Sequence, residues 1–169
     1  MDTFSSDDGG TETGTPGGEG SGSSVAADDN FMRGTFVFRD GSEMDLDVPA
    51  HYRRSEFGDA VQHSCEGSDA ETGLILGVSW RDGTTVGTHT PSLADGPGFF
   101  AAWNQAEGGG VRATLPSAGE LSFVSVGIQP GDLGEGTARA LLYPDDDDPN
   151  DLVSEIVEIE FRCMVEEDE

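Results

Sequence analysis

The sequence predicts an all-β domain, an antiparallel β-sandwich or barrel of about seven to nine strands, preceded by a disordered N-terminal arm. Short runs rich in β-branched and aromatic residues recur along the chain, and Gly- or Pro-containing turns separate them. In the clearest runs, apolar and charged residues alternate with a period of two, which is typical of a half-buried strand. Helical patterns are sparse, with candidates only at residues 56–63 and 99–106.

The first 30 residues differ in composition from the rest of the chain. They are rich in Gly, Ser, Thr and acidic residues and contain neither a basic residue nor an apolar period, so we expect a flexible acidic linker over residues 1–30. The positive start and apolar run of a secretory signal are missing, and we expect no direct membrane insertion. Residues 31–169 then form a single all-β domain.

The first two strands are expected as a hairpin. Residues 35–38 and 42–48 are β-rich, and the Asp40-Gly41 pair between them is a strong hairpin signal. A second hairpin is expected where residues 74–80 reach Arg81-Asp82-Gly83 and residues 84–90 return alongside.

The later strands follow the same pattern of apolar runs between turns. They are expected at residues 111–115, 120–128, 137–143 and 157–165. The last is the clearest, because apolar side chains on one face alternate with Glu158, Glu160 and Arg162 on the other.

The two cysteines, Cys65 and Cys163, are 98 positions apart, and Cys163 lies on the predicted inward face of the last strand. In an exported protein such a pair predicts a disulfide, whereas in a reducing cytosol it predicts two buried thiols. The pair is therefore a disulfide candidate, and its spacing is too long for a redox motif.

The charge balance excludes whole classes of partner. The chain has 34 acidic and 8 basic residues, for a net charge of −26. Such a surface repels nucleic acid and anionic membranes, so we expect no nucleic-acid partner. All eight basic residues are Arg and no Lys is present. An ordinary acidic protein could have such a composition, and so could an acidic partner of basic proteins.

This composition resembles that of proteins from extremely halophilic archaea. Residues 31–169 carry 27 acidic residues and 8 Arg, or −19, and this self-repulsion opposes compaction in dilute buffer. At about 1 M salt the Debye length is about 3 Å, so most of the repulsion is screened. The resemblance implies a domain that folds in multimolar salt.

A second resemblance concerns location. The run from Asp2 to Thr15 looks like the Ser/Thr/Gly/Asp tether that follows the lipidated cysteine of haloarchaeal surface lipoproteins, although the lipid-bearing Cys is absent from the sequence. This resemblance implies a location at the cell surface or outside the cell rather than in the cytoplasm. The alternative is a plain disordered N-terminus on a soluble protein.

Two clusters are candidates for binding. Asp146, Asp148 and Asn150 have the one, three, five spacing of a calcium loop, but Asp151 and Val157 replace the Gly and Glu that such a loop needs. The segment therefore predicts a solvated turn or a weak cation site, and no other cofactor is expected. The aromatic cluster of Phe99, Phe100 and Trp103 predicts either core packing or a surface for a sugar or an envelope partner.

No motif for catalysis stands out. The three histidines, His51, His63 and His89, are expected to be peripheral or internally satisfied, and no Gly-x-Ser-x-Gly nucleophile elbow occurs. We therefore expect a non-enzymatic structural or ligand-binding module of the cell envelope. The alternatives are a carboxylate- or metal-dependent hydrolase and an intracellular protein-interaction module. A histidine in a cleft beside two carboxylates would favour the hydrolase.

Overall fold

The computed structural model describes residues 30–71, 73–92, 96–103, 110–112, 119–144 and 154–167. The arm predicted at residues 1–30 lies outside this part of the chain, apart from Asn30. The strands are β1 (Phe31–Phe38), β2 (Glu43–Phe57), β3 (Ala60–Asp69), β4 (Leu74–Arg81), β5 (Gly87–His89), β6 (Gly98–Trp103), β7 (Gly110–Arg112), β8 (Gly119–Ser125), β9 (Leu133–Pro144) and β10 (Ser154–Met164).

The all-β prediction is confirmed, and every strand pairing is antiparallel. The described residues form a 10-stranded sheet, slightly more than expected because β3 and β6 were not predicted as strands. Within the same residues, the structure contains no helix with the length and apolar character needed to cross a membrane.

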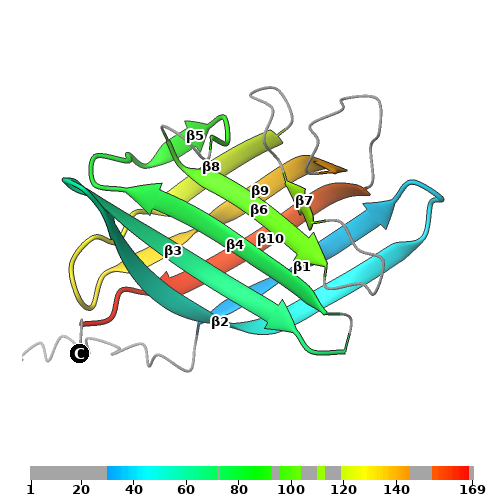
Figure 1. The fold of residues 1–169 in the computed structure, drawn as a ribbon, viewed down its shortest axis with the longest axis horizontal. Helices are drawn as coiled ribbons and strands as arrows, with labels where there is room; N and C mark the ends of the chain where they lie inside the picture. The colour runs from blue at the N-terminus through cyan, green and yellow to red at the C-terminus, as the bar shows by residue number, and fades with distance from the viewer. Residues whose placement is uncertain are drawn as a thin grey trace, which may run out of the picture.

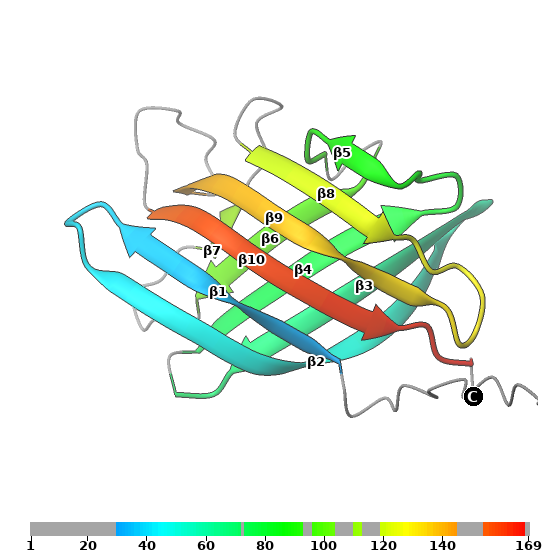
Figure 2. The ribbon, with the colours of Figure 1, turned by 180° about the vertical axis from the view of Figure 1, so that it is seen from behind.

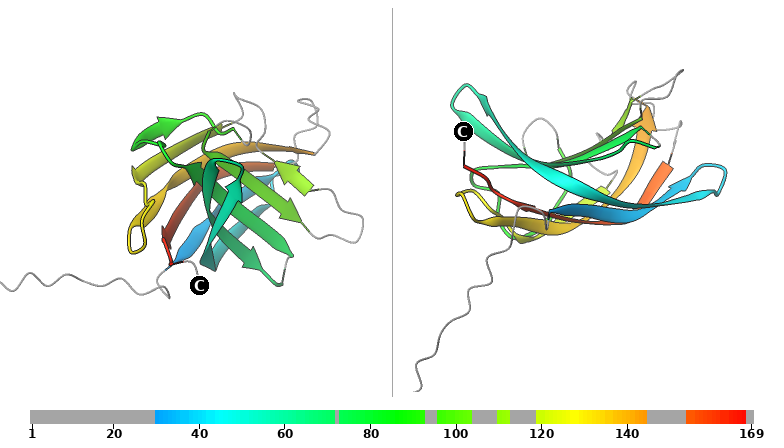
Figure 3. Two further views of the ribbon diagram at one scale, coloured as in Figure 1. Left: turned by 60° about the vertical axis from the view of Figure 1, so that its left-hand side comes forward. Right: turned by 90° about the horizontal axis from the view of Figure 1, so that it is seen from below.

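The strands form two curved layers that share β2 and β9 (Figures 1 and 2). One layer has the order β5-β8-β9-β10-β1-β2, and the other has the order β2-β3-β4-β6-β7-β9. Residues 43–49 of β2 pair with β1 and residues 50–57 pair with β3, so β2 passes from one layer to the other at Pro49. The curvature is clearest in Figure 3. The result is a curled, barrel-like sheet around one interior.

The alternation of each strand places apolar side chains in this interior. On β10, Ile159, Phe161 and Cys163 are buried and Glu158 and Glu160 are exposed, as the sequence pattern predicted. The largest buried side chains come from both layers: Trp80, Phe36, Phe99, Phe161, Met32, Leu74, Leu76, Leu121, Leu142 and Ile159. Over the described ranges, the acidic residues therefore remain on the outside of an apolar core.

The first predicted hairpin is confirmed and the second is wrong. β1 pairs with β2 across the Asp40-Gly41 turn, where Gly41 has a positive φ of 82°. The chain also turns at Gly83, but β5 does not return along β4. Instead β5 pairs with β8 in the opposite layer, because β6 occupies the free edge of β4 and His89 packs on Phe123.

The helix predicted over residues 56–63 is also wrong. β2 and β3 form a hairpin in which Phe57 pairs with Ala60, and Gly58 turns the chain with a positive φ of 63°. The strand β3 escaped prediction because its inward positions carry His63, Cys65 and Gly67 rather than large apolar residues. The other helix candidate is corrected over residues 99–103, which belong to β6; residues 104–106 lie outside the described residues.

Candidate functional site

A cavity of about 250 Å³ lies at one end of the interior, between the two layers. Its wall comes from the β2–β3 hairpin, the turn after β4, the loop from β8 to β9 and the residues that follow β10, which gather at the left-hand end of Figure 1. The lining residues are Tyr52, Arg54, Val61, His63, Asp82, Ile128, Gln129, Pro130, Val165 and Glu166. The mouth of a β-barrel is a common place for a ligand site.

Strand periodicity brings the β2 and β3 side chains into the pocket. Inward positions of β2 carry Leu46, Val48 and Ala50 in the core, and the same face continues to Tyr52 at the pocket. His63 lies on the inward face of β3 and is only 2% exposed. The apolar core therefore gives way to polar side chains where the layers open.

Three side chains form a hydrogen-bonded chain along the pocket wall. The Tyr52 hydroxyl lies 2.7 Å from Nδ1 of His63, and Nε2 of His63 lies 3.1 Å from Oδ1 of Asp82. The Asp82 carboxylate can only accept, so Nε2 donates to it. In neutral His63, Nδ1 is then an acceptor, and the Tyr52 hydroxyl donates to it. Both ring nitrogens are satisfied within the protein.

Aromatic packing holds the His63 ring in place. The ring stacks on Trp80 with centroids 5.9 Å apart, and the Trp80 indole N–H donates to the carbonyl oxygen of Gly127 at 2.7 Å. Phe123 meets the Trp80 ring edge to face at 5.9 Å. Since Trp80 is on β4 and Gly127 follows β8, this bond connects the two layers behind the pocket.

Hydrogen bonds also fix the opposite wall of the pocket. The Asp132 side chain accepts from the backbone N–H groups of Ile128 and Gln129 at 3.4 and 3.0 Å. The N–H of Gly131 donates to the Val165 carbonyl and the N–H of Val165 donates to the Asp132 carbonyl, each at 2.9 Å. The loop is thus attached to the chain after β10, and the pocket has two preorganised walls.

The charges at the pocket are one Arg and two carboxylates. The Arg54 guanidinium forms an ion pair with Glu56 at 2.8 Å, and its side chain is 30% exposed. Asp82 and Glu166 are exposed acidic residues on the lining. Because Glu56 compensates Arg54, the balance of the lining is negative.

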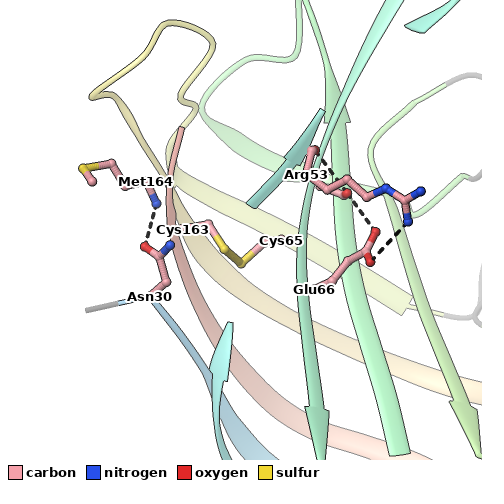
Figure 4. Close-up of a disulfide and its surroundings, with 7 residues drawn as sticks. Asn30, Arg53, Cys65, Glu66, Cys163 and Met164 are labelled. Carbon is pink, nitrogen blue, oxygen red and sulfur yellow. Dashed lines mark hydrogen bonds and ion pairs between the residues drawn. A yellow bond between two sulfur atoms is a disulfide. The ribbon is translucent and has the colours of Figure 1, made fainter. Parts of the chain in front are cut away.

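The cysteines join the layers beside this site. Cys65 of β3 and Cys163 of β10 form a disulfide, shown in Figure 4 with its surroundings. Cys65 follows His63 on the same face of β3, and Val165 of the pocket lies two residues beyond Cys163, just after β10. Near the bond, the N–H of Met164 donates to the Asn30 side chain at 2.8 Å. The bridge therefore fixes the spacing of the layers at the pocket end.

Two of the aromatic candidates, Phe99 and Phe100, lie on opposite faces of β6. Phe99 points into the core and is fully buried, so in this structure it has no access to a ligand. Phe100 points to the opposite face of β6, where its ring lies against Gly77 of β4. Alternation along the strand places the two rings on opposite faces of β6, and for Phe99 this is the core packing that the sequence left open. Trp103 ends β6, and its side chain lies outside the described residues.

The cation candidate cannot be placed. Asp146, Asp148 and Asn150 lie outside the described residues. Within the part of the chain that is described, no group of three or more His, Cys, Asp or Glu side chains is arranged to hold a metal ion.

Each of the three histidines is either exposed or hydrogen-bonded within the protein. His51 is exposed on β2, and His89 is bonded through Nε2 to the Thr85 carbonyl oxygen at 2.7 Å. His63 is satisfied, as the sequence predicted, but its partners Tyr52 and Asp82 were not predicted. The available signals were the inward register of β2, which continues to Tyr52, and the turn that places Asp82 beside β3.

No family model, curated protein or solved structure matches this chain.

Proposed function

We propose that this protein is a non-enzymatic ligand-binding module of the cell envelope that works in concentrated salt. The observation that carries the proposal is the pocket between the layers, whose wall is built from Tyr52, His63 and Asp82. Ligand sites combine apolar walls with a few fixed polar groups, and this pocket has both. Its volume of about 250 Å³ suits a small molecule or one side group of a larger one.

The disulfide and the net charge support a location at the cell envelope. Disulfides persist in oxidising surroundings and are rare in reducing cytosol, and the Cys65–Cys163 bond joins the two layers. The net charge of −26 favours a salt-rich medium, in which carboxylate repulsion is screened. Together these features favour a module exposed to the outside of the cell.

A hydrolase is the second candidate, because Tyr52, His63 and Asp82 form a hydroxyl–imidazole–carboxylate chain. Acyl transfer also needs N–H donors aimed at the developing oxyanion. The loop amides of Ile128, Gln129 and Gly131 already donate to Asp132 and Val165. This engagement favours binding over hydrolysis.

The binding proposal is tested with the full chain in concentrated KCl. A mixture of small amines, acids, alcohols and sugars is screened by ligand-observed saturation-transfer NMR against the wild type and Val61→Phe, which fills the pocket with a larger side chain. The matched control is Val124→Phe, because Val124 is 70% exposed on β8 outside the pocket lining. We expect signals that persist in the control and disappear in Val61→Phe. Identical signals in all three proteins, or none, would contradict the proposal.

The hydrolase is tested separately with p-nitrophenyl esters and glycosides. We expect no release of p-nitrophenol above the rate in buffer. Release by the wild type that Tyr52→Phe abolishes would replace the binding proposal with the enzymatic one, because that substitution removes only the hydroxyl.

A further inference from the structure

The polar wall of the pocket presents hydrogen-bond acceptors. When His63 is neutral, the Tyr52 hydroxyl donates its only hydrogen to Nδ1 of His63, so toward any other group its oxygen acts as an acceptor. Asp82 uses Oδ1 for His63, and an ionised carboxylate has about four acceptor positions. Glu166 adds a second carboxylate to the same lining. A complementary ligand therefore carries N–H or O–H donors.

The charges of the lining restrict the class of ligand further. Arg54 is paired with Glu56 at 2.8 Å, which leaves the Asp82 and Glu166 carboxylates to set the sign of the pocket. An anion entering the pocket would meet like charges, whereas a cation would make charge-assisted hydrogen bonds, which are roughly twice as strong as neutral ones. The lining therefore suits a cationic donor.

The pocket lining also carries three apolar side chains. Val61 lies on β3 two residues before His63, whereas Ile128 and Pro130 lie on the loop from β8 to β9, and Ile128 is 39% exposed despite its size. A ligand with a short hydrocarbon tail would cover this surface at a gain of about 25 cal/mol per Å² of apolar area removed from water. The cavity of about 250 Å³ limits that tail to a few carbons.

Salt decides between classes of cation. In about 1 M salt, exposed charges are screened within about 3 Å, so charge alone gives little preference over Na⁺ or K⁺. Hydrogen bonds from N–H donors to these acceptors, and contacts of a tail with the apolar side chains, act at short range and survive this screening. A quaternary ammonium ion lacks the N–H donors.

We infer that the pocket between the layers binds a small aliphatic ammonium ion, with its N–H groups on Tyr52, Asp82 and Glu166 and its tail against the apolar side chains Val61, Ile128 and Pro130. This inference rests on the proposed binding function and specifies its ligand class.

The test uses four probes of similar size: n-butylammonium, tetramethylammonium, butyrate and 1-butanol. Each is titrated into the isotopically labelled full chain in concentrated KCl, and the methyl signals of Val61 and Ile128 are followed by NMR. We expect n-butylammonium to shift both, and each of the other three to bind at least about tenfold more weakly, as expected when charge-assisted hydrogen bonds are lost.

Variants of the two carboxylates test whether they accept hydrogen bonds from n-butylammonium. Glu166→Gln and Asp82→Asn should each raise the Kd for n-butylammonium about tenfold, since each removes one charged acceptor. Glu166 is exposed at the end of the described chain, so its variant tests the inference even if Asp82→Asn disturbs folding. The matched control, Glu43→Gln, changes an exposed acid on β2 outside the pocket lining and should leave the Kd unchanged.

The outcomes separate this inference from the proposed function. Binding of n-butylammonium with an unchanged Kd in both pocket variants overturns the inference, and so does equal or tighter binding of butyrate or 1-butanol. The absence of shifts with all four probes also overturns it. In each of these cases the proposed binding function is still supported if another compound of the broader screen gives a signal that Val61→Phe removes.

Discussion

Tyr52 and His63, on neighbouring strands of one hairpin, share a hydrogen bond of 2.7 Å that connects the exposed pocket to a buried imidazole. The Asp82 carboxylate at 3.1 Å takes the other ring nitrogen, so neutral His63 has its hydrogen on Nε2. A histidine that looks isolated in the sequence is thus the centre of a fixed polar chain.

Replacing Tyr52 by Phe should leave Nδ1 of the buried His63 ring without this donor. An unsatisfied buried acceptor costs about 1–3 kcal/mol, and we expect a loss of stability in that range. Denaturant unfolding in concentrated KCl measures the loss, and ¹⁵N NMR of the wild-type imidazole should show the Nε2–H tautomer. An Nδ1–H tautomer in the wild type would refute the hydrogen-bond assignment.

The disulfide should contribute strongly to stability. The bond joins residues separated by 98 positions, and closing a loop of about 100 residues is worth up to about 4–5 kcal/mol in the chain-entropy account. We expect Cys65→Ala/Cys163→Ala to unfold at a markedly lower temperature than the wild type. The wild type should lose a similar amount on reduction, whereas the double variant should not respond to reductant. Two reactive thiols in the untreated, denatured wild type would show that the bond is not formed.

Close packing between the layers predicts a further sensitive position. A Cβ added at Gly134 of β9 would lie 2.5 Å from Cζ2 of Trp80, a distance that forces the indole or the strand to move. We expect Gly134→Ala to destabilise the fold by about 1–3 kcal/mol through overpacking. Gly96→Ala is the matched control, because among the described residues its Cβ would meet only Ser92, at 3.9 Å. Similar unfolding curves for the two variants would contradict this account of the packing.

The fold class could be predicted because the largest signals were local. The alternation over β10 and the Asp-Gly turn between β1 and β2 each depend only on residues that are close together in the sequence, so the sequence predicts these strands directly. The second hairpin failed because strand pairing is decided by tertiary packing: β6 takes the edge of β4, and β5 crosses to β8. Turn chemistry alone does not encode which edge is free.

Most of the site could not be predicted from the sequence, because it is assembled from segments that are far apart in the chain. Cys65 and Cys163 were recognisable as a pair, since no other cysteine is present. Tyr52, His63 and Asp82 carry no motif spacing, and they meet only because β2, β3 and the end of β4 are adjacent. The acidic background also conceals the particular carboxylates that face the pocket.

The turn between β1 and β2 should be sensitive to pH. The Ser42 hydroxyl and N–H donate to Asp40 at 2.6 and 2.9 Å, and the hydroxyl bond is the main cause that lowers the pKa of Asp40 below its ordinary value. The folded turn thus favours the carboxylate, a contribution present above the unfolded pKa and lost as the pH falls through the folded pKa. NMR titration should give a lowered pKa in the wild type and a higher one in Ser42→Ala. An equal pKa in both would assign the shift to another cause.

Salt should control whether the domain folds. Residues 31–169 carry 27 acidic residues and 8 Arg, and the acidic side chains that the structure describes lie outside the core, where their repulsion opposes folding. Added KCl shortens the Debye length to about 3 Å near 1 M and relieves that repulsion. We expect the β circular-dichroism signal to disappear on dialysis into low-salt buffer and to return in concentrated KCl. Sucrose is the control, because it favours compact states by exclusion without screening charge, so it should restore less structure. An unfolding midpoint that is the same in dilute buffer and in concentrated KCl would refute the role of the charged surface.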